Sequence, residues 1–171
     1  MIVYHFMLAP GSNHLCNGCA FLSDHVDAAR QHFEHNDLSF AAVSRAPMEQ
    51  ILAVKKRMGW QFNWVSSFGS DFNFDYQVSF TKNRPAEGHA FYNFEPRAAG
   101  SEGEAPGISV FATDGADVFH TYSSYARGGD LLIGAYNWLD LAPKGRNEST
   151  VMDWVRLHDE YAQVPGACCS H

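Results

Sequence analysis

The sequence predicts one α/β domain over residues 1–171, with a mixed central sheet that helices cover on both faces. Three observations predict this fold class. Two apolar runs enclose an amphipathic segment near the N-terminus, a glycine turn separates two strand-like runs further on, and helical patterns follow toward the C-terminus. The first observation predicts a parallel β-α-β half of the sheet, and the second predicts an antiparallel β-hairpin.

The first 45 residues are predicted to form the β-α-β unit. Residues 2–8 are a mostly apolar run, which is typical of a strand covered on both faces. From Cys16 to Phe33, apolar residues recur at spacings of 3 and 4, which predicts a helix. Residues 38–43 form a second apolar run. A helical crossover of this length makes the two strands parallel, with a right-handed connection.

A second helix and a third strand are expected next. Pro47 suits the first turn of this helix, and Gly59 suits the position just past its end. Residues 62–65 are predicted to form the third strand. Residues 74–80 alternate between apolar and polar types, which indicates a one-sided strand, with a short helix as the alternative. We expect residues 60–107 as a whole to be an insertion into the domain.

The C-terminal part is predicted to hold the hairpin and further helices. The turn Asp114-Gly115 separates two strand-like runs between residues 108 and 122. Helices are expected over residues 130–161, and Thr150 and Asp153 form a capping pair for the last of them. A flexible tail follows over residues 162–171.

Composition and charge exclude several classes of protein. Aromatic residues make up 14% of the chain, which is more than a disordered protein carries. The net charge of −7 excludes a nucleic-acid partner, because a phosphate backbone needs a positive surface. No apolar run approaches the ~20 residues of a membrane-spanning helix. Residues 1–10 lack a basic segment and a cleavage site, so we expect a cytoplasmic protein.

The cysteine spacing predicts the chemistry. Cys16-Asn-Gly-Cys19 follows the first strand directly, and together with the element order this is the thioredoxin pattern. Cys16 lies at the start of the predicted helix, where free N–H groups and the helix dipole favour a thiolate. Cys19 begins the buried stripe one turn later. We therefore predict a thiol–disulfide oxidoreductase with Cys16 as the nucleophile and Cys19 as the resolving thiol.

The second strand is expected to bring further residues to the same edge of the sheet. Ser44 and Arg45 leave the carboxyl end of that strand, beside the loop that carries Cys16. A guanidinium near Cys16 would favour the thiolate or hold an anionic substrate. The alternatives for Arg45 are a surface ion pair or a cap of the second helix.

One alternative to a redox enzyme is a non-catalytic or metal-binding module. Cys16 and Cys19 with His14 or His25 could form a soft site for zinc or copper. The sequence offers no second Cys-x-x-Cys and no His pair at zinc spacing, so we expect no metal and no cofactor. Cys168-Cys169 at the tail is either a second dithiol or part of a frayed end.

Ten short runs between residues 2 and 161 carry a resemblance to a known family. They are Tyr4-His-Phe-Met7, Cys16-x-x-Cys19, Val43-Ser-Arg-Ala-Pro47, Lys56-Arg-Met-Gly-Trp60, Trp64-Val-Ser-Ser67, Gly69-Ser-Asp-Phe-Asn73, His120-Thr-Tyr-Ser123, Tyr125-Ala-Arg127, Pro143-Lys-Gly-Arg146 and His158-Asp-Glu-Tyr161. The chain resembles a bacterial family of unknown function whose members are described as thioredoxin-like dithiol–disulfide oxidoreductases.

The resemblance implies a thioredoxin-like fold and a dithiol that reacts with a protein or small-molecule disulfide and a thiol electron donor. Thioredoxins place a cis-proline before the strand that faces the dithiol, and Pro106 is the candidate here. Trp64 and Arg127, within the matching runs, join Ser44 and Arg45 as candidates for substrate binding or thiolate tuning. Relatives usually carry an additional N-terminal segment before the first strand. Either its absence exposes apolar surface and favours a homodimer, or the start codon is misassigned.

A peroxiredoxin-like thiol peroxidase is the main enzymatic alternative. The Ser-Arg-Ala-Pro segment and the aromatic third strand also resemble that branch of the thioredoxin superfamily. The peroxidatic pattern Pro-x-x-x-Thr-x-x-Cys is absent, however, because Asn13 stands three residues before Cys16. Arg45 or Arg127 would have to replace the arginine that such enzymes carry on a later strand.

Overall fold

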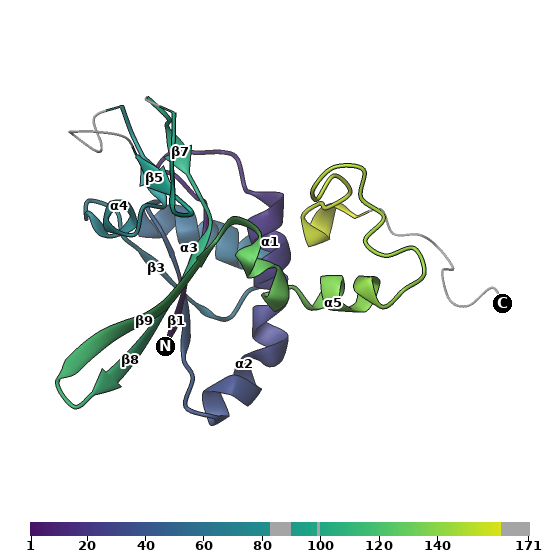
Figure 1. Cartoon of the computed structure of the whole chain (residues 1–171), viewed down its shortest axis with the longest axis horizontal. Helices are drawn as coiled ribbons and strands as arrows, with labels where there is room; N and C mark the ends of the chain where they lie inside the picture. Colours follow the sequence, from purple (N-terminus) through teal and green to yellow (C-terminus); the bar gives the residue numbers. More distant parts are fainter. Residues whose placement is uncertain (83–89, 99, 162–171) are drawn as a thin grey trace.

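The structure, a computed structural model, describes residues 1–82, 90–98 and 100–161. Its centre is a five-stranded mixed sheet with the strand order β3-β2-β1-β8-β9 (Figure 1). Three neighbouring strands are parallel, and the other two form an antiparallel pair beside β1. The strands are β1 (Ile2–His5), β2 (Phe40–Ser44), β3 (Asn63–Ser66), β8 (Gly107–Asp114) and β9 (Asp117–Tyr125). The mixed α/β sheet predicted from the sequence is confirmed.

The register of β1 determines which loops lie together at the end of the sheet where β1 and β2 finish and β8 begins. His5, the last residue of β1, pairs with Val43 on β2 and with Gly107, the first residue of β8. The chain therefore leaves β1 beside the point where β8 begins. Pro106 stands directly before that point, so the Cys16 loop and Pro106 are brought to one edge by strand pairing alone.

The predicted first helix is two helices in the structure, α1 (Asn17–Asp24) and α2 (Val26–His35). They meet at His25, whose ring is held on both sides. Its Nδ1 donates to the carbonyl of Phe21 at 2.7 Å, and its Nε2 accepts the N–H of Ala135 at 3.0 Å. The spacing of apolar residues continues unchanged through His25, so the sequence pattern gives no sign that this tertiary contact divides the helix.

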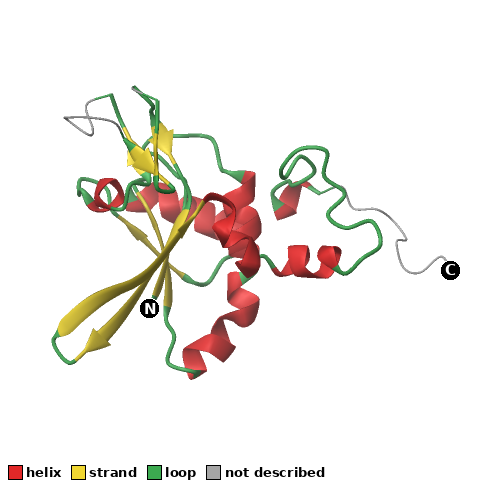
Figure 2. Ribbon diagram, viewed as in Figure 1, coloured by secondary structure: helices red, strands yellow, loops and turns green. Residues whose placement is uncertain are grey.

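The helices α1 and α3 (Met48–Met58) pack on the same face of the sheet (Figure 2). Their buried residues share one core with Tyr4, Ala42 and Trp64, which are aligned across β1, β2 and β3. Two right-handed crossovers that step in the same direction place their helices on one face. Helices on both faces were predicted, but the longer helices α1 and α3 lie on the same face.

Residues 60–107, expected as an insertion, begin with β3 of the central sheet, and the described residues that follow β3 cover the opposite face. His5 on that face lies against the rings of Phe72 and Tyr76, with centroids 5.8 and 5.3 Å away, at the short helix α4 (Phe72–Asp75). The strand predicted over residues 74–80 is wrong for its first half, where the helical alternative holds. The insertion also contains β4 (Ser79–Phe80) paired with β7 (Gly103–Glu104), and β5 (Phe91–Tyr92) paired with β6 (Glu95–Pro96).

The hairpin prediction is confirmed, since β8 and β9 pair around a turn in which Gly115 has φ +63°. The chain continues through η1 (Ala126–Leu132), α5 (Gly134–Asp140) and η2 (His158–Glu160). None of the helices in the described ranges is both long and apolar enough to cross a membrane.

The last helix predicted from Thr150 is wrong. The side chain of Asp153 accepts the N–H groups of Ser149 and Thr150 at 2.9 and 3.1 Å, as a capping residue would. Met152, however, has φ +58°, which is the left-handed region and ends any α-helix there. The predicted tail, with Cys168-Cys169, lies outside the described residues.

Candidate active site

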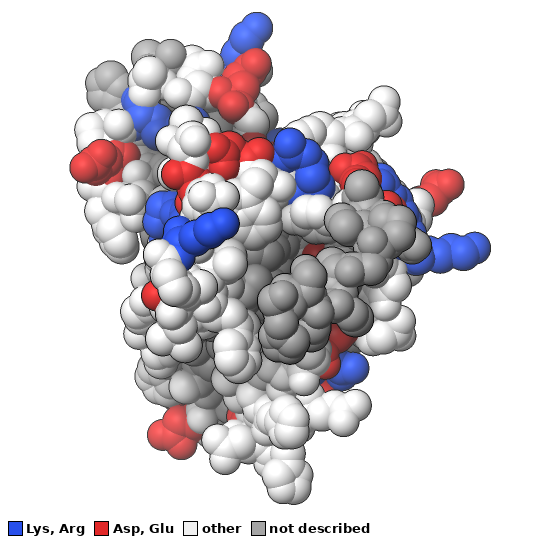
Figure 3. All heavy atoms as spheres, turned by 90° about the vertical axis from the view of Figure 1, so that its right-hand side faces the viewer, with Lys and Arg blue, Asp and Glu red and all other residues white. Residues whose placement is uncertain are grey.

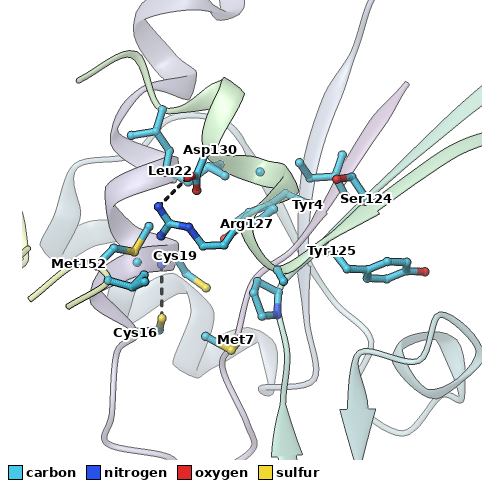
Figure 4. A pocket seen from close by; sticks show the side chains of 18 of the residues that line it. Tyr4, Met7, Cys16, Cys19, Leu22, Ser124, Tyr125, Arg127, Asp130 and Met152 are labelled. Carbon is cyan, nitrogen blue, oxygen red and sulfur yellow. Dashed lines mark hydrogen bonds and ion pairs between the residues drawn. The ribbon is translucent and has the colours of Figure 1, made fainter. Parts of the chain in front are cut away.

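Cys16 is the N-cap residue of α1. Its backbone is extended, and its Sγ accepts the backbone N–H of Cys19 at 3.3 Å (dashed in Figure 4). The side chain is partly exposed, and both thiols are free. A sulfur at this position satisfies one of the amides that a helix leaves unpaired at its start, so the helix itself stabilises a thiolate there.

These contacts lower the pKa of Cys16 to about 6. The largest cause is a hydrogen bond from the Cys19 thiol, and the backbone N–H groups of Cys19 and Gly18 act in the same direction. The charge of His14 adds to the effect, while burial opposes it. At neutral pH Cys16 is therefore mostly a thiolate, which is the nucleophilic form of cysteine.

Cys19 has the opposite properties. It is 1% exposed, and burial raises its pKa well above the usual value. Its hydrogen bond to Cys16 and the negative charge of that thiolate raise the pKa further. Hydrogen bonds with the Tyr4 hydroxyl and the backbone at Met7 act against this rise. The two thiols thus differ in both access and acidity, although only three positions separate them.

Tyr4 on β1 is a site residue that the sequence reasoning missed. It is 3% exposed, and burial raises the pKa of its hydroxyl well above the usual value, so the phenol stays protonated. A protonated phenol can donate a hydrogen bond to the Cys19 sulfur. The apolar run of residues 2–8 offered a signal, because a Tyr in a buried run needs a polar partner.

If the two thiols perform the exchange predicted from the sequence, Tyr4→Phe should slow the attack of Cys19 on a mixed disulfide about tenfold, because it removes a hydrogen bond to a developing charge. Tyr4 acts through Cys19, so the alkylation rate of Cys16 should stay unchanged. Stopped-flow release of a chromogenic thiol separates the two steps. Mixing the reduced protein with a chromogenic disulfide reports the attack of Cys16, and starting from protein that already carries the chromogenic thiol as a mixed disulfide on Cys16 reports the attack of Cys19. A slower first step at Cys16 would show that the variant disturbs the whole site.

Both thiols line a cavity of about 350 Å³ (Figure 4). Its walls come from α1, the end of β1, the start of β8, the end of β9, η1 and residues 151–152, together with Tyr92 of β5. Pro106 and Arg127, two of the predicted site residues, line the same cavity. The Arg127 guanidinium is paired with Asp130 at 2.6 Å. The structure thus brings Cys16, Cys19, Pro106 and Arg127 together.

The other three predicted residues lie elsewhere. Arg45 lines a separate cavity of about 250 Å³, where its Nε donates to Glu104 at 2.8 Å and its guanidinium stacks on Phe74 at 4.8 Å. Ser44 donates to the carbonyl of Phe6 at 2.7 Å and accepts the indole N–H of Trp64 at 3.0 Å. Ser44 and Trp64 are buried, and these bonds make them part of the core.

The histidines considered as metal ligands have other partners or lie in the open. His14 is exposed and acts on Cys16 through its charge, and both ring nitrogens of His25 are engaged. Among the described residues, no group of three or more His, Cys, Asp or Glu side chains lies close enough to hold a metal ion.

Comparison with known proteins identifies the family. The sequence model of a family of bacterial proteins of unknown function (DUF899) matches residues 1–161. The chain belongs to this family. No curated protein and no solved structure matches the chain. DUF899 membership supports the bacterial family that the short runs indicate, but it carries no redox activity with it. The geometry of Cys16 and Cys19 therefore has to carry any functional proposal.

Proposed function

We propose that the protein is a thiol–disulfide oxidoreductase with a thioredoxin-like fold, in which Cys16 is the nucleophile and Cys19 the resolving thiol. One observation carries the proposal, namely the contrast between the two thiols. Cys16 is partly exposed with a pKa of about 6, and Cys19 is buried one turn later with a raised pKa. Dithiol exchange needs this pair of properties, an acidic attacking thiol and a close, protected second thiol.

The sheet supports the fold assignment. The Cys16 loop follows the first strand of a β-α-β unit, and an antiparallel hairpin pairs with the other side of that strand. Pro106, directly before the hairpin, lines the same cavity as both thiols. A proline before the strand that faces the dithiol is the arrangement that a thioredoxin-like fold implies.

The reaction balances as follows. The Cys16 thiolate attacks one sulfur of a disulfide, so a Cys16–substrate S–S bond forms, the substrate bond breaks, and the leaving thiolate takes a proton. Cys19 loses its proton and attacks Cys16 Sγ, which forms the Cys16–Cys19 bond and releases the second thiol. The protein is oxidised by two electrons, and two molecules of an external thiol return it to the dithiol.

We further propose the cytoplasm as the compartment, because its thiol pool supplies that electron donor and keeps such pairs reduced. We propose no nucleic-acid partner for this protein. On the face shown in Figure 3, Lys and Arg side chains are interspersed with Asp and Glu, and the chain carries a net charge of −7. No cofactor is needed, because the two thiols carry both electrons.

The pH dependence of alkylation tests the proposal. The rate at Cys16 should rise with pH and reach half its maximum near pH 6, because the thiolate is the reacting form and the pKa of Cys16 is about 6. Cys19 should be labelled much later at every pH. Peptide mapping by mass spectrometry assigns the label, and a Cys168→Ser/Cys169→Ser background removes the tail thiols. Earlier labelling of Cys19, or a midpoint near pH 9, would contradict the assignment.

Redox titration of the same background should give one two-electron step with a Cys16–Cys19 disulfide as its product. Reaction with hydrogen peroxide distinguishes the enzymatic alternative. Under this proposal, peroxide should oxidise Cys16 no faster than it oxidises another thiol of the same pKa. Rapid peroxide consumption through a sulfenic acid at Cys16 would instead favour a thiol peroxidase.

A further inference from the structure

The cavity beside the thiols is poor in groups that recognise polar ligands. Besides the Cys16 thiolate, the charged groups among the described residues that line it are Arg127 and Asp130. Asp130 is already engaged, because it pairs with Arg127 at 2.6 Å and with Arg146 at 2.8 Å. Tyr92 donates its hydroxyl proton to the carbonyl of Pro106 at 2.7 Å and accepts the N–H of Ala126 at 2.8 Å. Tyr125 donates to the carbonyl of Tyr76 at 3.4 Å. These tyrosines have committed their hydroxyls and offer ring surface to a ligand.

The remaining wall is largely hydrocarbon and thioether. Leu22, Ile108 and Ile133 are buried residues that reach the cavity from α1, β8 and the start of α5. Met152 closes the side near the cysteines, since its Sδ lies 2.9 Å from where a β-carbon on Gly18 would be. Asn17 holds this segment in place, because its Nδ2 donates to the carbonyl of Val155 at 3.0 Å.

An extended polypeptide finds few partners at this edge. A peptide that binds beside a strand pairs with free backbone N–H and C=O groups. Here the N–H of Ala105 already donates to the carbonyl of Val78 at 2.8 Å, Pro106 has no N–H, and its carbonyl accepts from Tyr92. Gly107 and Ile108 lie in β8, which is paired on both sides.

From this geometry we infer that the substrate is a small disulfide with an apolar arm, and that the cavity holds this arm while Cys16 attacks the sulfur. The inference rests on the proposed function and names its substrate class. A cavity of about 350 Å³ is at the lower end of small-molecule sites. During the mixed-disulfide stage the arm stays in the cavity beside Cys19. Resolution then releases it as an apolar thiol.

The test compares dimethyl, diethyl and dipropyl disulfide with bis(2-hydroxyethyl) disulfide and with insulin as a protein substrate. Each rate with the reduced protein is divided by the rate of the same disulfide with free dithiothreitol, which removes differences in chemical reactivity. The normalised rate should rise about 3-fold for each methylene added to an arm, as expected for burial of apolar surface. The hydroxyethyl compound and insulin should lie below dipropyl disulfide.

Two variants locate the preference. Met152→Gln keeps the length of the side chain but makes the wall polar, so it should reduce the ratio of dipropyl to hydroxyethyl rates at least about 3-fold. The alkylation profile of Cys16 should not change. Leu141→Gln is the matched control, because Leu141 is 83% exposed and does not line the cavity. This control should leave the ratio unaltered.

Dipropyl sulfide, which thiols cannot cleave, reports on the cavity alone. It should shift the methyl NMR signals of Ile133 and Met152 in the reduced protein and in Cys16→Ser. If dipropyl sulfide binds but no disulfide is reduced, the proposed function is wrong, while the inference that the cavity holds an apolar arm is retained. If disulfides are reduced in proportion to their chemical reactivity, or insulin is preferred, and dipropyl sulfide does not bind, the inference is overturned while the proposed function stands.

Discussion

Cys16→Ser should lower the rate of disulfide reduction at least about 100-fold, because a serine hydroxyl is not ionised near neutral pH and cannot take the place of the thiolate. The fold should survive, since Cys16 is partly exposed and a serine oxygen can accept the same N–H of Cys19 that caps α1. Turnover of a chromogenic disulfide and the thermal unfolding curve measure the two effects separately.

Cys19→Ser should fail at the second step and accumulate a mixed disulfide on Cys16. Mass spectrometry of the intact protein after one equivalent of substrate would show the added thiol, and reductant would remove it. Full turnover by Cys16→Ser would end the proposal that this motif performs the chemistry. If Cys19→Ser turned over at the rate of the parent protein, Cys19 would not be the resolving thiol.

Local patterns were sufficient to predict the frame that carries the thiols. The apolar runs of β1 and β2, the helical character of the segment between them and the turn at Gly115 all depend on residues close together in the chain. Once a helical crossover joins two strands, parallel pairing follows, and the loops after them reach one edge. The position of Cys16 at a helix start follows from the same reasoning and agrees with its place as N-cap.

The parts that were missed depend on contacts between distant segments. The pairing of Tyr4 with Cys19 and the wall formed by Met152 need the folded arrangement of segments far apart in sequence. The left-handed backbone at Met152 has no local signal, because a methionine there usually continues a helix. The residues near Arg45 likewise do not indicate that it pairs with Glu104, which lies 59 positions later in the chain.

Arg45 is the residue whose expected behaviour changes most between sequence and structure. From the sequence, Arg45 was expected to tune Cys16 or hold an anionic substrate, with a surface ion pair or a cap of the second helix as the alternatives. In the structure its side chain is 17% exposed and pairs with Glu104, whose side chain is 6% exposed. Glu104 also accepts the hydroxyl of Ser79, so its carboxylate sits inside a hydrogen-bonded group between the end of β2 and the β4–β7 sheet.

Arg45→Met should therefore lower the free energy of unfolding by about 3 kcal/mol or more, since removal of one partner leaves a buried charge without compensation. The double variant Arg45→Met/Glu104→Gln should regain much of that loss, because the uncompensated charge is gone. Urea unfolding of the parent protein, both single variants and the double variant completes the cycle. The alkylation midpoint of Cys16 should stay near pH 6 in Arg45→Met, because the contacts that lower the pKa of Cys16 come from α1 and His14. A midpoint shifted to higher pH with unchanged stability would assign Arg45 to thiolate tuning instead of to this buried pair.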